Sequence, residues 1–191
     1  MDELKKKILE EATVLPGNVL RVDSFLNHQL DVKLLSACAK EWYERFKNEG
    51  VTKILTIESA GIGIATIAAQ YFGVPVVYAK KTKSASIGND FYSAKVVSYT
   101  HGQVFEIFVA KKFIDGDDKI LLIDDMLANG SALKVLINLA EMGGAKIVGA
   151  GVVIEKSNQK GGKDLRDMGY RVESLAKISS ISTDGKIKFA D

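Results

Sequence analysis

Four short apolar runs constrain the fold of this chain more than any other feature. They occupy residues 54–57 (ILTI), 74–77 (VPVV), 120–123 (ILLI) and 147–154 (IVGAGVVI). A strand with one face in solvent alternates apolar and polar residues, whereas a strand covered by helices on both faces is apolar throughout. Stretches with helical periodicity lie between the runs, so the sequence predicts an α/β fold with a doubly wound, mostly parallel sheet.

Helical spacing, glycine stops and alternating segments predict the remaining elements. Helices are expected over about residues 2–12, 31–50, 61–73 and 131–143, with a short one near 163–168. Two alternating segments, residues 94–100 and 103–110, are joined through His101 and Gly102, which predicts a β-hairpin. Residues 61–79 carry no charge and approach the length of a membrane span, but Gly73 and Pro75 divide them into a helix and a strand.

Composition limits the partners and the compartment. The chain has 191 residues, 47% of them hydrophobic and 26% charged, which predicts a single domain over residues 1–191. Its formal net charge of +2 favours neither nucleic acid nor an anionic membrane as a partner. Cys38 is the only cysteine, which excludes an intrachain disulfide and a cysteine-based zinc site. Since the first residues are charged and lack the apolar core of a signal peptide, we expect a cytoplasmic protein.

Two adjacent acids follow the third apolar run. Residues 121–133 read LLIDDMLANGSAL, with Asp124 and Asp125 where the apolar residues stop. Successive residues of a strand point to opposite faces, so two acids inside a buried strand would each be costly to bury. We therefore expect the strand to end at the acids and both carboxylates to meet solvent or ligand at its carboxyl edge, where open α/β sheets bind ligands.

The small residues after the acids are suited to a phosphate. Ala128, Asn129, Gly130, Ser131 and Ala132 cross from the strand into the next helix. Backbone N–H groups converge at such a helix N-terminus, and the dipole favours an anion. The acids would then accept hydrogen bonds from sugar hydroxyls or hold water on Mg²⁺, which together indicates a ribose phosphate. Taken alone, however, this pattern more often marks a solvated strand end and an ordinary helix cap.

The wider sequence resembles the type I phosphoribosyltransferases. LLIDDMLANGSAL is similar to their motif for phosphoribosyl diphosphate (PRPP), and Glu58-Ser59-Ala60-Gly61, after the strand KILTI, resembles their loop for the pyrophosphate of PRPP. The resemblance implies that Asp124 and Asp125 are the catalytic pair. It assigns PRPP to Ala128, Asn129, Gly130, Ser131, Ala132, Glu58, Ser59, Ala60, Gly61 and Lys81.

Three other phosphate-binding or acid-bearing folds fit less well. Gly61-x-Gly63 after a strand is typical of dinucleotide binding, but Thr66 replaces the third glycine and the region about 20 residues on is rich in lysine rather than acidic. No GxxxxGK[ST] motif of a P-loop occurs. A receiver domain carries paired acids near the start of its chain, whereas here they lie two-thirds of the way along.

A lysine-rich segment lies between the two PRPP elements. Lys80, Lys81 and Lys83 fall within residues 80–93, which by sequence alone read as a solvated surface loop. The resemblance implies instead the flexible loop that closes over PRPP, with Lys81 neutralising the diphosphate and closure excluding water.

Within the family, the chain is similar to the bacterial purine-salvage enzymes that use xanthine. LPGNVLRVDSFLNHQLD, ESAGI, DDMLANGSA and GVVIEK occur in the same order and spacing. The resemblance implies a hood over about residues 13–30, completed by a C-terminal segment, and a base site at Leu20, Asn27 and Lys156. By sequence alone these three read as a core residue, a turn residue or cap, and a solvated lysine.

The reaction implied is PRPP plus xanthine giving xanthosine 5'-monophosphate (XMP) and pyrophosphate. Mg²⁺ would bind mainly through PRPP, with water linking it to Asp124 and Asp125 and no direct protein ligand, and a homodimer is usual in the family. Two alternatives remain. One is a transferase for guanine or hypoxanthine, and the other is a noncatalytic PRPP-sensing regulator. Such a regulator would need a nucleic-acid-binding domain or a strongly basic face, and the sequence indicates neither.

Overall fold

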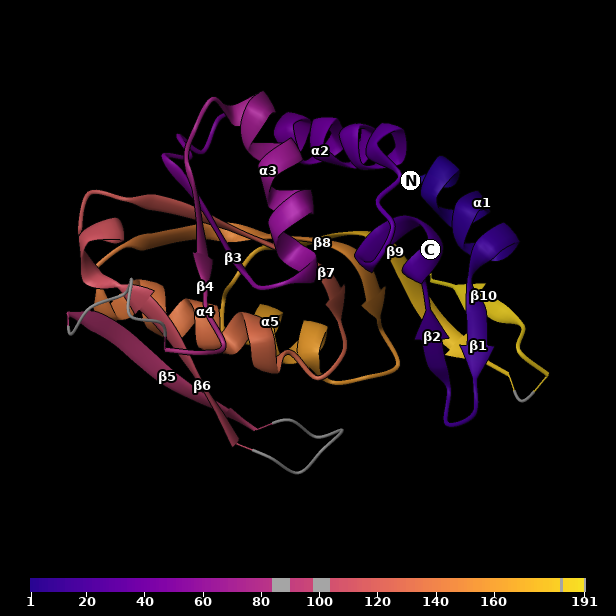
Figure 1. Ribbon diagram of the computed structural model, residues 1–191. Helices are drawn as coiled ribbons and strands as arrows, with labels where there is room; N and C mark the ends of the chain where they lie inside the picture. The colour runs from indigo at the N-terminus through magenta and orange to yellow at the C-terminus, as the bar shows by residue number, and fades with distance from the viewer. Residues whose placement is uncertain (84–89, 98–103, 183, 191) are drawn as a thin grey trace.

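A six-stranded sheet forms the centre of the molecule in the computed structural model, which describes all residues except 84–89, 98–103, 183 and 191 (Figure 1). The strand order is β10-β9-β8-β7-β3-β4. The strands are β3 (Lys53–Ile57), β4 (Val76–Ala79), β7 (Lys119–Leu127), β8 (Lys146–Lys156), β9 (Val172–Ile181) and β10 (Ile187–Phe189). All neighbours are parallel except β10 and β9, so the predicted mostly parallel sheet is confirmed.

Helices and a hairpin cover the two faces of the sheet (Figure 1). One face carries α1 (Asp2–Glu11), α2 (Val32–Phe46) and α3 (Ala60–Phe72). The other carries α4 (Ser131–Met142), α5 (Gly161–Asp167) and the antiparallel pair β5 (Phe91–Val97) and β6 (Val104–Ala110). Each side has its own apolar core, which is why the central strands are apolar on both faces.

The N-terminal segment forms a small structure beside the edge of the sheet. A hairpin of β1 (Thr13–Leu15) and β2 (Val19–Arg21) precedes a π-helical turn, η1 (Asp23–Asn27). We expected this region, about residues 13–30, only as a hood segment, without the hairpin or the helical turn. In Figure 1 this hairpin lies next to β9 and β10.

Two boundaries differ from the prediction. The strand β7 does not end at the acids, because Met126 and Leu127 continue its pairing with β8. The helix α3 begins at Ala60, so Gly61 lies in its first turn rather than in the preceding loop. The expected hairpin turn at His101 and Gly102 and the centre of the segment 80–93 lie outside the described residues.

The uncharged stretch of residues 61–79 divides as expected. The helix α3 ends at Gly73, whose φ of 67° is the left-handed conformation that glycine adopts without strain, and β4 follows. Among the helices that the structure describes, each falls short of the length and hydropathy needed to cross a bilayer.

Candidate active site

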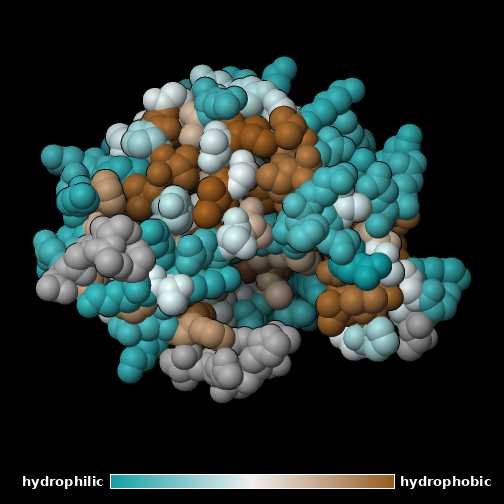
Figure 2. Space-filling model, in the orientation of Figure 1, coloured by the Kyte–Doolittle hydropathy of each residue, from teal (hydrophilic) through white to brown (hydrophobic). Residues whose placement is uncertain are grey.

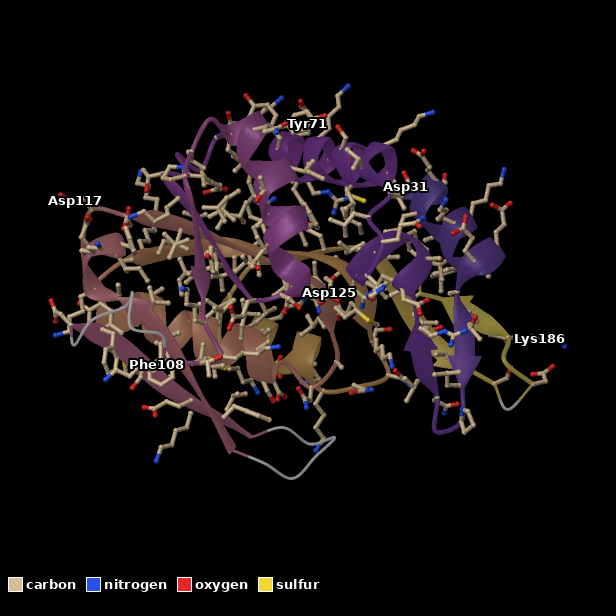
Figure 3. The ribbon with its side chains drawn as sticks, in the orientation of Figure 1. Asp31, Tyr71, Phe108, Asp117, Asp125 and Lys186 are labelled. Atoms are coloured by element: carbon tan, nitrogen blue, oxygen red, sulfur yellow. The ribbon has the colours of Figure 1, made fainter. Side chains whose placement is uncertain are left out.

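The two motifs predicted to bind PRPP meet at one edge of the sheet. β3 and β7 are parallel neighbours, so the chain segments that leave their carboxyl ends lie next to each other. β3 leads through Glu58 and Ser59 into α3, and β7 leads through residues 128–130 into α4. Figure 2 shows the molecular face hollowed near this edge, and Figure 3 labels Asp125 there.

Asp124 is buried, contrary to the expectation that both acids meet solvent or ligand. Its exposed fraction is 4%, and β7 continues beyond it, since Met126 and Leu127 still pair with β8. Its Oδ1 accepts a hydrogen bond from the backbone N–H of Asp125 at 3.0 Å. Burial, and next the charge of Asp125, raises the pKa of Asp124 well above the usual carboxyl range, while Lys81 acts in the opposite direction.

Asp125 is only half-buried, and its carboxylate contacts the N-terminal segment. Oδ2 accepts a hydrogen bond from Nδ2 of Asn27 at 3.1 Å, and Oδ1 accepts one from the backbone N–H of Met126 at 2.9 Å. The structure therefore brings together Asn27, predicted to contact the base, and Asp125, predicted to contact the ribose.

The loop predicted to bind phosphate is tightly folded at the N-terminus of α4. Gly130, with a φ of 81°, provides the left-handed turn into the helix. Oδ1 of Asn129 accepts the backbone N–H of Ser131 at 3.0 Å, an Asx turn. The side chain of Asn129 thus holds one of the N–H groups that the sequence left free for a phosphate.

The loop after β3 is packed just as closely. A Cβ on Gly61 would lie 2.0 Å from Oγ1 of Thr56, so only glycine fits. The peptide bond between Glu58 and Ser59 is cis. Oε1 of Glu58 accepts the backbone N–H of Lys81 at 2.5 Å, which ties the start of the lysine-rich segment to this loop. β3 and β7 are parallel neighbours, so this hydrogen bond also places the backbone of Lys81 near the segment that follows β7.

The remaining predicted base-site residues come from β2 and from the end of β8. Nζ of Lys156 donates to the backbone carbonyl of Asn18 at 3.2 Å, so the N-terminal hairpin closes against β8. Burial lowers the pKa of Lys156. Leu20 is 5% exposed and packs into the core under α1, α2 and α3, which agrees with its reading as a core residue.

Sequence reasoning missed one contact with the loop of residues 128–130, which we call the phosphate loop. The backbone N–H of Gly161, at the start of α5, donates to the carbonyl of Ala128 at 3.1 Å. The pair Gly161-Gly162 was the only signal in the sequence, and it gave no indication of what the glycines approach.

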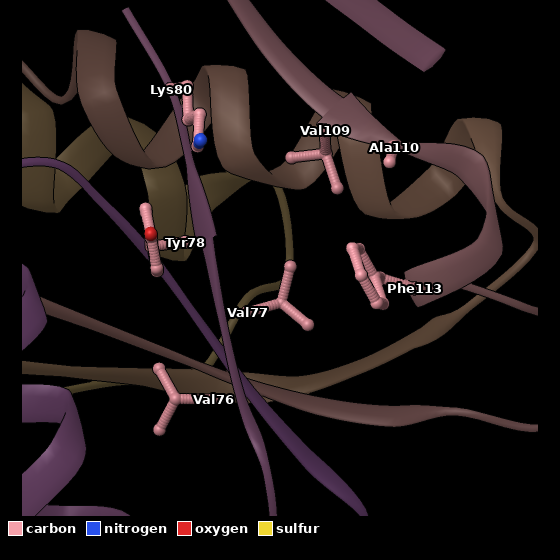
Figure 4. A pocket seen from close by; sticks show the side chains of 7 residues that line it. All are labelled: Val76, Val77, Tyr78, Lys80, Val109, Ala110 and Phe113. Atoms are coloured by element: carbon pink, nitrogen blue, oxygen red, sulfur yellow. The ribbon is translucent and has the colours of Figure 1, made fainter. Parts of the chain in front are cut away.

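A groove also lies away from the predicted site residues. A groove of about 350 Å³ is lined by Val76, Val77, Tyr78, Lys80, Val109, Ala110 and Phe113 (Figure 4). Its lining comes from β4 with the following Lys80, and from β6 with Phe113, and none of the predicted site residues lines it.

Known proteins are similar to this chain in sequence or in fold. Residues 21–182 match the family model of the phosphoribosyl transferase domain. The chain is 48% identical to a xanthine phosphoribosyltransferase of Ruminiclostridium cellulolyticum over 100% of both chains. It is 51% identical to xanthine phosphoribosyltransferase 2 of Clostridium botulinum, over 96% of this chain and 97% of the relative.

Solved structures with a similar fold have lower sequence identity. The adenine phosphoribosyltransferase (APRTase) of Giardia lamblia, complexed with 9-deazaadenine, has a TM-score of 0.77 at 24% identity and covers 93% of this chain and 98% of its own. The adenine phosphoribosyltransferase of Rhodothermus marinus also has a TM-score of 0.77, at 20% identity, over 93% of this chain and 100% of its own. At such identity the similarity concerns the fold alone.

Proposed function

The chain belongs to the phosphoribosyltransferase family, and on that premise we propose that it transfers the 5-phosphoribosyl group of PRPP to xanthine, releasing pyrophosphate and forming XMP in purine salvage. The family and the type I fold predicted from the sequence are both confirmed. Two relatives at 48% and 51% identity, named for xanthine, support an enzyme of this specificity over a guanine or hypoxanthine transferase and over a noncatalytic regulator.

One observation carries the proposal at the level of the site: the paired acids of β7 lead directly into a glycine turn at the N-terminus of α4. In our proposal Asp124 and Asp125 hold the ribose hydroxyls, and residues 128–132 hold the 5'-phosphate through backbone N–H groups. The segment from Glu58 to Gly61, with Lys81, receives the leaving pyrophosphate.

Catalysis would be electrostatic and positional. Departure of pyrophosphate leaves positive charge on the ribose ring, as in glycoside cleavage. The carboxylate of Asp125, which we assign to the ribose, can stabilise that charge, while the two segments proposed to bind phosphate fix the geometry of the sugar. No covalent nucleophile is required.

The proposed base site consists of Leu20, Asn27 and Lys156. Xanthine has oxygens at C2 and C6 and loses a proton readily, so an ammonium and an amide match its acceptors, whereas adenine would need acceptors from the protein. The hydrogen bond from Lys156 to Asn18 supports a role of the N-terminal hairpin, residues 13–30, as a hood over the base.

Mg²⁺ fits this site as a partner of the substrate. Among the residues that the structure describes, no group of three or more His, Cys, Asp or Glu side chains could hold a metal ion. Asp124 and Asp125 are the acids available, and the raised pKa of Asp124 favours its neutral form. Mg²⁺ bound mainly to PRPP would supply charge neutralisation of the diphosphate.

The proposal has three further parts. Residues 80–93 would close over PRPP. The hydrogen bond from the backbone N–H of Lys81 to Glu58 would hold one end of this segment beside the proposed pyrophosphate site. The enzyme would act as a homodimer in the cytoplasm. The apolar surface over α3 in Figure 2 supports a subunit contact, and a lone buried Cys38 suits a reducing compartment.

Pyrophosphate release tests the function. The enzyme is incubated with PRPP and Mg²⁺ and with xanthine, guanine, hypoxanthine or adenine in turn, and xanthine is expected to give the highest kcat/KM. Replacing Asp124 and Asp125 together by Asn should lower turnover by roughly 100-fold or more. Asp117→Asn, on an exposed turn, serves as the matched control.

Three outcomes would contradict the proposal. A higher kcat/KM for guanine or hypoxanthine would favour the alternative transferase. PRPP binding without pyrophosphate release from any purine would favour a regulator. Undiminished kcat/KM in the double Asn variant would remove the acids from the mechanism.

A further inference from the structure

The first turn of α5 lies directly against the phosphate loop. The hydrogen bond from Gly161 to Ala128 joins the two backbones at 3.1 Å. A Cβ on Gly161 would lie 2.4 Å from the backbone N of Gly130, 2.5 Å from the carbonyl O of Ala128 and 2.5 Å from the carbonyl C of Asn129. Because no atom larger than hydrogen fits there, the position of α5 fixes the position of the loop.

An ion pair between a partly exposed arginine and a buried glutamate holds α5 in that place. A helix of seven residues is too short to be stable by itself. Arg166 of α5 donates to both carboxylate oxygens of Glu155, at 2.8 and 2.7 Å. Glu155 is 2% exposed, and Oγ of Ser174 donates to it at 2.5 Å. A Cβ on Gly162 would lie 1.9 Å from Oε1 of Glu155, so the helix rests on this carboxylate.

The charge of Glu155 is maintained in spite of burial. Burial alone would raise its pKa, but the hydrogen bonds from Arg166 and Ser174 outweigh it and lower the pKa below the usual value. In the register of the sheet, Glu155 pairs with Leu127, the last residue of β7 before the phosphate loop. The ion pair therefore sits beside the point where the loop begins.

A second ion pair joins α4 to α5 and is weaker than that between Glu155 and Arg166. Nζ of Lys134, in the first turn of α4, lies 2.8 Å from Oδ2 of Asp164 on α5. Both side chains are more than a third exposed, at 38% and 40%, so this pair contributes little compared with the two hydrogen bonds from Arg166 to the buried Glu155.

We propose that Glu155 and Arg166 are positioning residues for the phosphate loop: by clamping α5, they set the loop geometry that receives the 5'-phosphate of PRPP. This inference rests on the proposed function. Neither side chain belongs to the proposed PRPP site, so the effect passes through Gly161 and the backbone of residues 128–130. A merely structural role would instead change stability without changing the affinity for PRPP.

Gly161→Ala isolates the contact with the loop. Calorimetry with PRPP and Mg²⁺, KM for PRPP and for xanthine, and Tm are measured on the full chain. The dissociation constant and KM for PRPP should rise by between about ten- and a hundredfold, while KM for xanthine at saturating PRPP stays close to that of the wild type. Gly116→Ala is the matched control, since its Cβ would meet only the carbonyl of Gly144 at 3.9 Å.

The ion pair needs a variant that keeps the fold. Arg166→Leu alone would leave Glu155 charged and buried, which can prevent folding. Replacing Glu155→Leu together with Arg166→Met, and with Ser174→Ala so that no hydroxyl loses its partner, removes both charges, and such apolar replacements are often neutral or stabilising. We expect an unchanged or higher Tm together with weaker PRPP binding.

The outcomes separate this inference from the function on which it rests. If the wild type binds PRPP but Gly161→Ala and the triple variant bind it equally well, positioning by α5 is refuted and the proposed function stands. Positioning by α5 is also refuted, and the proposed function again stands, if KM for PRPP and KM for xanthine rise by the same factor in Gly161→Ala. If the wild type itself binds no PRPP, the proposed function fails and this inference fails with it.

Discussion

The hydrogen bond between Asn27 and Asp125 leads to a counterintuitive prediction. The amide that we propose to bind the base is engaged, at 3.1 Å, with a carboxylate proposed to bind the ribose. In the free enzyme one of the two N–H groups of Asn27 is held in this bond, so the bond must break before that N–H can donate to xanthine. Asp125→Ala, although it should abolish most turnover, is expected to bind xanthine more tightly than the wild type when PRPP is absent.

The size of the effect follows from the environment of the bond. A hydrogen bond to a charged group contributes about 1.5 to 3 kcal/mol when it is shielded from water. Asn27 is exposed and Asp125 only half-buried, so solvent screening reduces this to about 0.5 to 1 kcal/mol. The dissociation constant for xanthine should fall by a factor of about two to five.

Titration calorimetry of xanthine into the free enzyme measures this directly. Asp124→Asn is the matched control, because Asp124 bonds the backbone of Asp125 and not Asn27. If both variants gain affinity for xanthine equally, the cause is the loss of negative charge and not the release of Asn27. Unchanged or weaker binding by Asp125→Ala would refute the idea that the carboxylate competes for Asn27.

Two further predictions concern stability. Burial lowers the pKa of Lys156 from its ordinary 10.5, so the penalty for its charge is fully present below the lowered pKa and disappears as pH rises through 10.5. The unfolding free energy of Lys156→Met relative to the wild type should therefore be highest near neutral pH and decline toward alkaline pH, and a constant difference in denaturation at several pH values would contradict this. Gly61→Ala should cost about 1 to 3 kcal/mol by overpacking against Oγ1 of Thr56. Because that hydroxyl is buried without a partner among the described residues, adding Thr56→Ala should recover most of the loss, and denaturation of the double variant that shows no recovery would count against the steric explanation.

The sequence by itself determined the elements and the general place of the site. Apolar runs without alternation required strands covered on both faces, and Gly73 marked the end of a helix that the structure confirms. The acids and the small residues after them could be assigned to the carboxyl end of the sheet, because parallel strands place all such ends on one edge. These inferences depend only on neighbours along the chain.

Tertiary structure alone decided how the parts of the site meet. The sequence predicted two accessible acids, but pairing of Met126 and Leu127 with β8 extends β7 and buries Asp124. Asn27 and Asp125 are 98 residues apart, and a helix and a strand separate Gly161 in the chain from the loop that it approaches. Periodicity reports which face a residue occupies, whereas the distance between segments remote in the chain depends on strand register and on how the helices pack over the sheet.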